Sequence, residues 1–218
     1  MDCWYANGCN LYKPDCQKVC HRYLEMKYLI SNCGMPNAER YIKPIRPEEC
    51  DLPAYRRLQE IKDNIVSFVE DSRQLYIVSD YFGNGKTTWA LKILYKYFDE
   101  IWCGNGFRIR GYFVYVPEFL NKVRSSSFRN SDEYRSLSKV INSADLVIWD
   151  DIASTNLDNY DHSNLATFID PRILKGKSNI YTGNLQAEAL SNALGNRLFS
   201  RVWDASEVVE LKGRSRRA

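Results

Sequence analysis

Several features that would narrow the class of this protein are missing from its 218 residues. No apolar run is long enough to cross a bilayer, which excludes a membrane-spanning segment. The first residues, Met1-Asp2-Cys3-Trp4, do not form a secretion signal, so we expect a cytoplasmic protein with reduced thiols. The net charge of +3 is too small to indicate nucleic-acid binding unless basic residues cluster locally. The absence of internal repeats argues against a repeat architecture.

The composition instead favours a folded core. Hydrophobic residues make up 44% of the chain, which is ample for a packed interior. The length suggests one full domain and a small extra module. We place the boundary after residue 50, with a cysteine-rich segment over residues 1–50 and an α/β domain over residues 51–218.

Cysteine is abundant for a protein with reduced thiols, at seven residues. Cys3, Cys9, Cys16 and Cys20 fall near the N-terminus, and His21 follows directly. In a reducing compartment such a cluster indicates metal before disulfide. Zn²⁺ takes four thiolate or imidazole ligands, so the four cysteines are predicted to close around one Zn²⁺. The spacings are not those of a Cys-x-x-Cys finger, and an iron–sulfur site or a set of unligated thiols are the alternatives.

One short stretch organises the rest of the sequence, the run Ser79-Asp80-Tyr81-Phe82-Gly83-Asn84-Gly85-Lys86-Thr87-Thr88. A β-like segment (residues 74–78) precedes it, and a segment with helical apolar spacing (residues 89–98) follows. Strand, glycine turn, Gly-Lys-Thr and helix form the context of a phosphate-binding loop. The backbone N–H groups at the helix N-terminus would face an anion. Lys86 would reach the outer phosphates, and the Thr87 hydroxyl would ligate Mg²⁺.

The loop departs from the full phosphate-loop pattern at one position. Gly83 and Gly85 allow the close backbone approach that phosphate binding needs. The pattern also asks for a glycine where this chain has Asp80, whose carboxylate is expected to repel phosphate or strain the turn. The alternative is an ordinary Gly-Asn-Gly turn followed by a chance lysine.

A second motif lies downstream, where the hydrophobic segment Asp145-Leu146-Val147-Ile148-Trp149 runs into Asp150 and Asp151. A strand that ends in two acids after a phosphate loop is a Walker B pattern. Asp150 is placed to hold Mg²⁺, and Asp151 is placed to polarise an attacking water. The alternative is a buried strand capped by an Asx turn.

The remaining segments predict an alternation of strands and helices. Helices are expected over residues 22–30, 58–69, 117–124, 133–141 and 188–203, and strands over 111–116, 178–184 and 208–211. Asn184, at the end of a strand, is suited to contact the γ-phosphate or the attacking water, although a plain turn asparagine is the alternative. The alternation predicts a mainly parallel α/β sheet with its ligand at the carboxyl ends of the strands.

Together these parts resemble the AAA+ domain of the DnaC/DnaI-type replicative helicase loaders of bacteria and phages, over roughly residues 51–218. Their fold is a P-loop core whose parallel sheet is flanked by helices, without a helical lid domain. The resemblance implies that ATP contacts the residues of the loop, namely Phe82, Gly83, Asn84, Gly85, Lys86, Thr87 and Thr88. It also implies Mg²⁺ at Thr87 and Asp150, and a sensor 1 role for Asn184.

The resemblance assigns roles to several basic residues as well. Arg197 matches the arginine finger, offered to the ATP of a neighbouring subunit, with Arg201 as the second choice. Arg217 matches sensor 2, and Arg214 and Arg216 are close enough to take its place. The helix after Val116-Pro117-Glu118 resembles the insertion that carries basic residues to single-stranded DNA, here Lys122 and Arg124, although a solvated charged helix face is the alternative.

The implied function is delivery of a hexameric replicative helicase, driven by ATP binding and hydrolysis in a homo-oligomer. The cysteine-rich segment resembles the metal-binding or helicase-binding extensions of some loaders. Turnover is expected to be weak, because the base is Asp151 where many AAA+ proteins carry glutamate. Two alternatives stay open: a nucleotide-switched adaptor without turnover, and a transposon-type ATPase that selects DNA targets.

Overall fold

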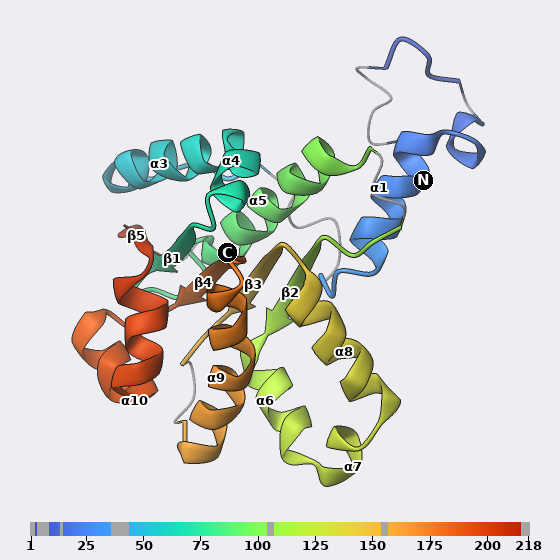
Figure 1. The fold of residues 1–218 in the computed structure, drawn as a ribbon. Helices are drawn as coiled ribbons and strands as arrows, with labels where there is room; N and C mark the ends of the chain where they lie inside the picture. The colour runs from blue at the N-terminus through green and yellow to red at the C-terminus, as the bar shows by residue number, and fades with distance from the viewer. Residues whose placement is uncertain are drawn as a thin grey trace.

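Five parallel strands form one sheet in the computed structural model, which describes residues 3, 9–13, 15–35, 44–103, 107–153 and 157–214. The order of the strands across the sheet is β2-β3-β4-β1-β5 (Figure 1). They are β1 (Gln74–Val78), β2 (Gly111–Tyr115), β3 (Leu146–Asp150), β4 (Ser178–Gly183) and β5 (Glu207–Glu210). Thus β4 lies between the strand before the glycine loop and the strand that ends in two acids. Their carboxyl ends meet at one edge of the sheet.

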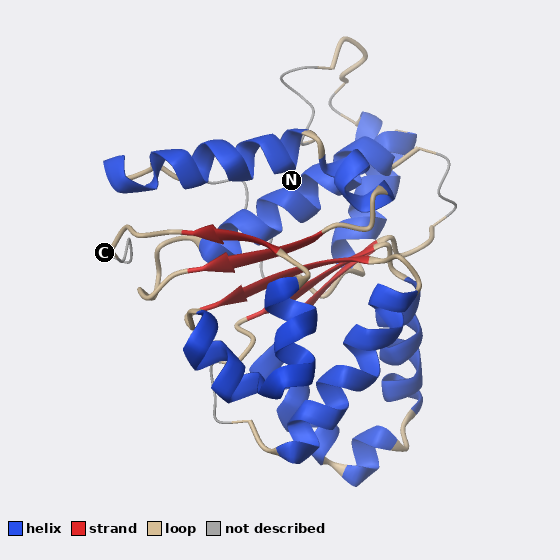
Figure 2. Ribbon diagram, turned by 60° about the vertical axis from the view of Figure 1, so that its left-hand side comes forward, coloured by secondary structure: helices blue, strands red, loops and turns tan. Residues whose placement is uncertain are grey.

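Helices cover both faces of the sheet (Figure 2). One face carries α1 (His21–Ser31), α3 (Leu52–Asp63), α4 (Ile65–Glu70) and α5 (Lys86–Ile101). The other carries α6 (Val116–Arg124), α7 (Ser126–Arg129), α8 (Asp132–Ser143), α9 (Asn159–Leu174) and α10 (Ala187–Phe199). Short turns precede or extend these helices at η1 (Cys16–Lys18), η2 (Glu49–Asp51) and the π-helical η3 (Ser200–Asp204).

The pleat of each strand divides the core into two clusters. In β1, Leu75 and Ile77 pack toward α5, whereas Tyr76 and Val78 pack toward α9 and α10. Every residue of β1 is buried, as expected for a strand with a helical layer on each side. The fold is therefore a three-layer α/β structure, and the sequence-based prediction of a mainly parallel α/β sheet is confirmed.

Two predicted helices are interrupted. The helix expected over residues 58–69 is divided into α3 and α4, because Asn64 takes non-helical angles (φ −110°, ψ 29°) between them. The helix expected over residues 188–203 bends at Gly195, whose φ of 70° and ψ of 158° lie outside the helical region. Glycine takes a positive φ without the steric cost that a Cβ atom brings.

The helix α9 was not predicted from the sequence. It contains Pro171 in its last turn and is opened by a capping box between Asp158 and Asp161. A proline inside a segment normally argues against a helix. Because of Pro171, the sequence pattern of this segment does not indicate a helix.

The N-terminal helix α1 belongs to the layer of helices that contains α5. Tyr23, Met26 and Leu29 are buried, and the latter two belong to the cluster around α5. Arg22 Nη2 also lies 2.7 Å from Asp99 Oδ1 on α5. The apolar face of α1 is therefore packed against the chain itself. The domain boundary at residue 50 stays a prediction. None of the described helices has the length and apolar character required to cross a membrane.

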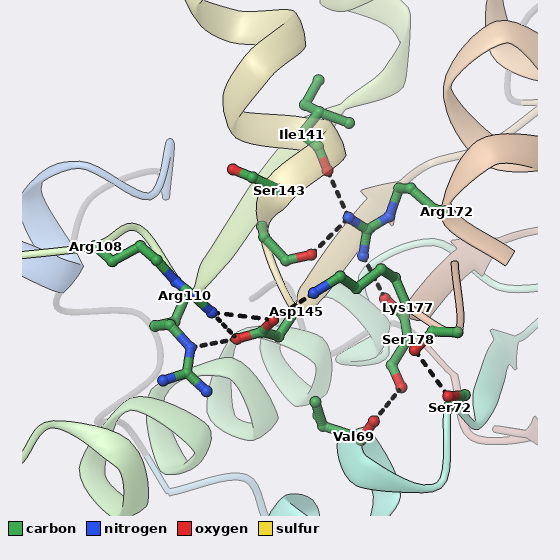
Figure 3. Close-up of polar contacts among 12 residues, drawn as sticks. Val69, Ser72, Arg108, Arg110, Ile141, Ser143, Asp145, Arg172, Lys177 and Ser178 are labelled. Carbon is green, nitrogen blue, oxygen red and sulfur yellow. Dashed lines mark hydrogen bonds and ion pairs between the residues drawn. The ribbon is translucent and has the colours of Figure 1, made fainter. Parts of the chain in front are cut away.

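A buried arginine joins the layers at the amino-terminal edge of the sheet (Figure 3). The side chain of Arg172 on α9 is fully buried and donates to the carbonyl oxygens of Ala144 (2.8 Å), Ser178 (2.7 Å) and Ile141. It also donates to Asn179 Oδ1 at 2.7 Å. Burial lowers the pKa of Arg172 to about 10, so the guanidinium remains charged at neutral pH.

Replacing Arg172 with methionine is expected to destabilise the protein. The change leaves buried carbonyl oxygens without a donor, at a cost of about 2–4 kcal/mol in the free energy of unfolding. Urea unfolding followed by circular dichroism measures this cost. Lys175→Met, at an exposed position three residues away, is the matched control and should leave the midpoint unchanged. An unchanged midpoint for Arg172→Met would contradict a structural role for this network.

Candidate functional site

The predicted phosphate-binding loop has the predicted setting. It runs from the end of β1 into α5, which begins at Lys86. Gly83 and Gly85 take positive φ values of 76° and 107°, as their place in a tight turn requires. Lys86 is buried and folds back on the loop, with Nζ donating to the carbonyl oxygen of Tyr81 at 2.9 Å. The loop thus already encloses the ammonium group that a phosphate would attract.

Asp80, the departure from the phosphate-loop pattern, lies away from this centre. Its side chain is exposed and accepts a hydrogen bond from Gln186 Nε2 at 3.3 Å. Gln186 is the residue before α10, so the contact ties the loop to that helix. Asp80 is not among the residues that line the cleft beside the loop. The carboxylate is therefore held where its effect on a bound phosphate is weakened by solvent.

Asp150 is the point where the loop, β3 and β4 meet. Its Oδ1 accepts hydrogen bonds from Thr87 Oγ1 at 2.8 Å and from Thr182 Oγ1 at 2.7 Å. Burial raises the pKa of the Asp150 carboxyl, and the two threonine hydroxyls counter part of that rise. The two predicted Mg²⁺ ligands, Thr87 and Asp150, are thus in direct contact. Their hydroxyl and carboxylate oxygens are the donor types that Mg²⁺ prefers.

Asp151 and Asn184 also come together. Asn184 Nδ2 donates to Asp151 Oδ1 at 3.4 Å, and the Asp151 N–H donates to Thr182 Oγ1 at 2.9 Å. Asp151 has a φ of 62°, which turns the chain sharply at the end of β3. Asn184 Oδ1 is buried, and no described residue donates to it. A water beside Asp151 Oδ1 would find an acceptor in this carboxylate and a donor in Asn184 Nδ2.

Thr182 is a site residue whose role the sequence did not reveal. Its hydroxyl donates to Asp150 and accepts from the backbone of Asp151, so it positions both acids. The available signal was its place near the end of β4, two residues before Asn184, which directly follows that strand. Its partner strand could not be inferred from the local pattern.

These residues line a large open cleft at the carboxyl ends of the strands, with a volume of about 1570 Å³. Its floor is formed by the loop residues 82–88 together with Asp150, Asp151 and Asn184. Pro44, Ile45 and Arg46 form one wall, and β2 with α6 forms another. The predicted loop, acids and strand-end asparagine therefore share one cavity, large enough for a nucleotide.

The two arginine-finger candidates, Arg197 and Arg201, are not among the residues that line this cleft. Arg197 donates to Asp170 Oδ2 through Nε at 3.0 Å, and Arg201 Nε lies 3.4 Å from Asp170 Oδ1. The Arg197 side chain is 77% exposed, whereas Asp170 is buried. The bend at Gly195 lies two residues before Arg197. One buried carboxylate therefore contacts both finger candidates, Arg197 at the end of α10 and Arg201 in η3.

The segment after β5 is anchored to the phosphate loop. Asn84 Nδ2 lies 3.3 Å from the carbonyl oxygen of Leu211 and 3.4 Å from that of Gly213. Asp51 Oδ1 accepts from the backbone N–H of Lys212 at 2.6 Å and of Gly213 at 3.0 Å. Arg214 therefore leaves from a point beside the loop. Arg216 and Arg217, the other sensor 2 candidates, lie outside the described residues.

The predicted DNA-binding residues of α6 are both engaged in ion pairs. Lys122 Nζ lies 2.9 Å from Glu118 Oε1, and Lys122 also lines the cleft. Arg124 Nη2 lies 2.8 Å from Asp158 Oδ2 and 2.7 Å from Asp161 Oδ2. Arg124 thus links α6 to α9, and two carboxylates compensate its charge.

The predicted zinc site is not supported. Cys3, Cys9, Cys16 and Cys20 are all described, yet no group of three or more cysteine, histidine or acidic side chains among the described residues is arranged to hold a metal ion. His21 faces elsewhere, with Nε2 3.4 Å from Glu25 and its ring against Trp102 at 5.9 Å. Because Zn²⁺ requires four converging ligands, this arrangement does not fit the ion.

Comparison with known proteins settles the fold. No protein-family model matches the sequence, and no curated protein matches it. The crystal structure of the DnaC helicase loader matches with a TM-score of 0.67 and 20% identity, over 81% of this chain and all of that one. DnaI matches with a TM-score of 0.64 and 16% identity, over 83% and 96% of the two chains. This chain has the AAA+ fold.

A replication initiator shares that AAA+ fold. DnaA bound to AMPPCP and single-stranded DNA matches with a TM-score of 0.63 and 17% identity, over 80% of this chain and half of the DnaA chain. The resemblance to DnaC/DnaI-type loaders, first indicated by short motifs, is thus confirmed in the arrangement of the strands and helices.

Thr182→Val tests the arrangement around Asp150. Loss of the hydroxyl removes one of the donors that orient this carboxylate, and such outer contacts are commonly worth 10- to 100-fold in metal affinity. We expect the Mg²⁺-dependent part of the affinity for a fluorescent ATP analogue to fall about tenfold. Thr167→Val, on the exposed side of α9, is the control. Equal Mg²⁺ dependence in the Thr182→Val variant and wild type would show that Thr182 does not position Asp150.

Proposed function

We propose that this protein is a weak AAA+ ATPase of the helicase-loader type, which binds ATP with Mg²⁺ and delivers a hexameric replicative helicase to DNA. The observation that carries the proposal is the convergence of Lys86, Thr87, Asp150, Asp151 and Asn184 at one end of the cleft. Phosphoryl transfer requires charge neutralisation and an aligned water, and these side chains are of the types that supply both.

Each residue has a distinct task in the proposed reaction. Lys86 exchanges the carbonyl oxygen of Tyr81 for phosphate oxygens, and the glycine-rich backbone receives the phosphate groups. Thr87 and Asp150 would hold Mg²⁺, which neutralises charge on the phosphates. Asp151 accepts a proton from the attacking water, and Asn184 orients that water through Nδ2, which lies beside the Asp151 carboxylate.

A second subunit would complete the site. Arg197 is exposed on α10 and does not line the cleft of its own chain, so it is suited to the cleft of a neighbour. Asp170 holds the guanidinium at two nitrogens, which limits the rotamers that must be ordered on assembly. In this proposal Arg201 is the reserve candidate and Arg217 acts as sensor 2.

The fold also supports a role in DNA replication. Two of the matching structures are helicase loaders or their relatives, and DnaA was solved with AMPPCP and single-stranded DNA. Lys122, at the margin of the cleft, is the proposed DNA contact on α6. The double ion pair of Arg124 favours an anchoring role for that residue. A nucleotide-switched adaptor without turnover is the second candidate, favoured by the short arm of Asp151.

ATP turnover is the first test of this function. Wild type should hydrolyse ATP, and single-stranded DNA or the replicative helicase should change the rate. Lys86→Ala should abolish turnover and weaken binding, whereas Asp151→Asn should abolish turnover but retain binding, because it removes the base and leaves the phosphate contacts. Phosphate release and binding of a fluorescent ATP analogue measure the two properties. Binding without turnover in wild type would establish the adaptor instead.

Arg197→Ala tests completion of the site by a neighbour. An arginine finger is worth about 10³-fold or more in rate, so turnover should fall by that order while ATP affinity is retained. In mixtures, Lys86→Ala subunits supply the finger that Arg197→Ala subunits lack, and activity should reappear. Arg135→Ala, at another exposed arginine, is the control. Failure of the mixture to recover any activity would argue against Arg197 as a finger.

A further inference from the structure

A cluster of basic side chains occupies the amino-terminal edge of the sheet, opposite the cleft (Figure 3). Arg108 and Arg110 precede β2, Lys177 precedes β4, and all three contact Asp145, which directly precedes β3. Lys177 Nζ lies 2.6 Å from Asp145 Oδ1, and Arg108 Nη2 lies 3.1 Å from Oδ2. Lys175 is exposed two residues before Lys177. We call Arg108, Arg110, Lys175 and Lys177 the amino-edge patch.

Positive charge is in excess at the amino-edge patch. Burial opposes ionisation of Asp145, but hydrogen bonds from Lys177 and Arg110 prevail, and the pKa of this carboxyl is lowered. Asp145 therefore contacts three cations, and the exposed Lys175 adds a fourth positive charge two residues before Lys177, so cations outnumber the one carboxylate within the patch. The charged guanidinium of Arg172 lies behind the patch, where Ser178 links it to Asp145 through the backbone.

An exposed aromatic ring adjoins these cations. Phe107 directly precedes Arg108 and is 55% exposed. Its ring is supported from behind by Tyr28 of α1, with the two ring centroids 5.1 Å apart in an edge-to-face arrangement. Phe107 also has a φ of 55°, an uncommon conformation for a bulky residue. The ring is thus fixed at the surface instead of being packed into the core.

We propose that the amino-edge patch and Phe107 form a binding site for single-stranded nucleic acid, separate from the nucleotide cleft. Basic side chains that hold the backbone, next to an aromatic side chain on which a base stacks, are the combination by which proteins bind single strands. The phosphates take the surplus charge, and a base stacks on the exposed ring of Phe107. An acidic peptide would use the charge but would leave the ring without a partner.

The site has defined limits on the molecule. On the β1 side, Ser72 Oγ donates to the carbonyl oxygen of Gly176 at 2.7 Å, which places the exposed acids Glu70 and Asp71 next to the end of the patch. A bound strand therefore extends from β4 toward β2 and Phe107. The patch is separated from Asp150 by the length of β3, about 16 Å. It also differs from α6, where carboxylates pair with both predicted DNA contacts.

Binding of fluorescein-labelled oligo(dT), measured by anisotropy over a range of salt concentrations, tests the site. Phe107→Ala should weaken binding by roughly tenfold through the loss of stacking. Arg108→Gln and Lys175→Gln should each reduce the slope of log K against log salt by about 0.7, the value for one phosphate contact on a single strand. Arg135→Gln should match wild type.

The variants separate this inference from the proposed ATPase function. Lys175→Gln leaves the ion pairs of Asp145 intact. A change in DNA binding by this variant would therefore not result from rearrangement of the side chains around Asp145. ATP turnover without DNA should be unchanged in all three variants. The proposed site would be overturned if all three variants bound oligo(dT) with the affinity and salt slope of wild type. Weaker binding by Lys122→Gln in the same experiment would support the DNA contact on α6 instead. Equal competition by polyglutamate and by unlabelled oligo(dT) would overturn single-stranded nucleic acid as the ligand.

Discussion

The carboxylate of Asp150 is the contact on which the geometry of the cleft depends. It accepts from Thr87 in the first turn of α5 and from Thr182 on β4, and it belongs to β3 itself. One oxygen atom therefore links the phosphate loop to the two neighbouring strands β3 and β4. Burial favours the neutral form of this carboxyl group. The two threonine hydroxyls and the charge of Lys86 favour the ionised form that Mg²⁺ would require.

Local pattern was sufficient for the elements that carry the chemistry. The strand before the loop, Lys86 at the start of a helix and the acids ending β3 each depend on a few adjacent residues, and each was predicted. Features set by distant partners were not. The ion pairs of Arg124 come from α9, the bend at Gly195 is hidden in an otherwise helical pattern, and convergence of thiols on a metal depends on the path of the chain. Spacing alone reports none of these contacts.

The two edges of the sheet have opposite electrostatic character. At the carboxyl edge, Asp150 and Asp151 face a loop with one buried lysine, an environment suited to a metal-bound polyphosphate. At the amino edge, Asp145 is outnumbered by the cations around it. The same strand, β3, carries a carboxylate at or next to each end, so a displacement of this strand would be felt at both surfaces. Parallel strands permit this division, because every strand contributes the same end to the same edge.

The anchoring of residues 211–213 has a consequence for synthesis of the protein. Asn84 of the phosphate loop and Asp51 before α3 both bond to this segment, and β5 pairs with β1 along its length. When residues 79–88 of a nascent chain have left the ribosome, β5 and the carbonyl oxygens of residues 211 and 213, which contact the loop, have not yet emerged. Contacts between positions so far apart close slowly in folding. ATP would therefore recognise the finished chain and not its translational intermediates, which makes nucleotide binding a mark of completed folding.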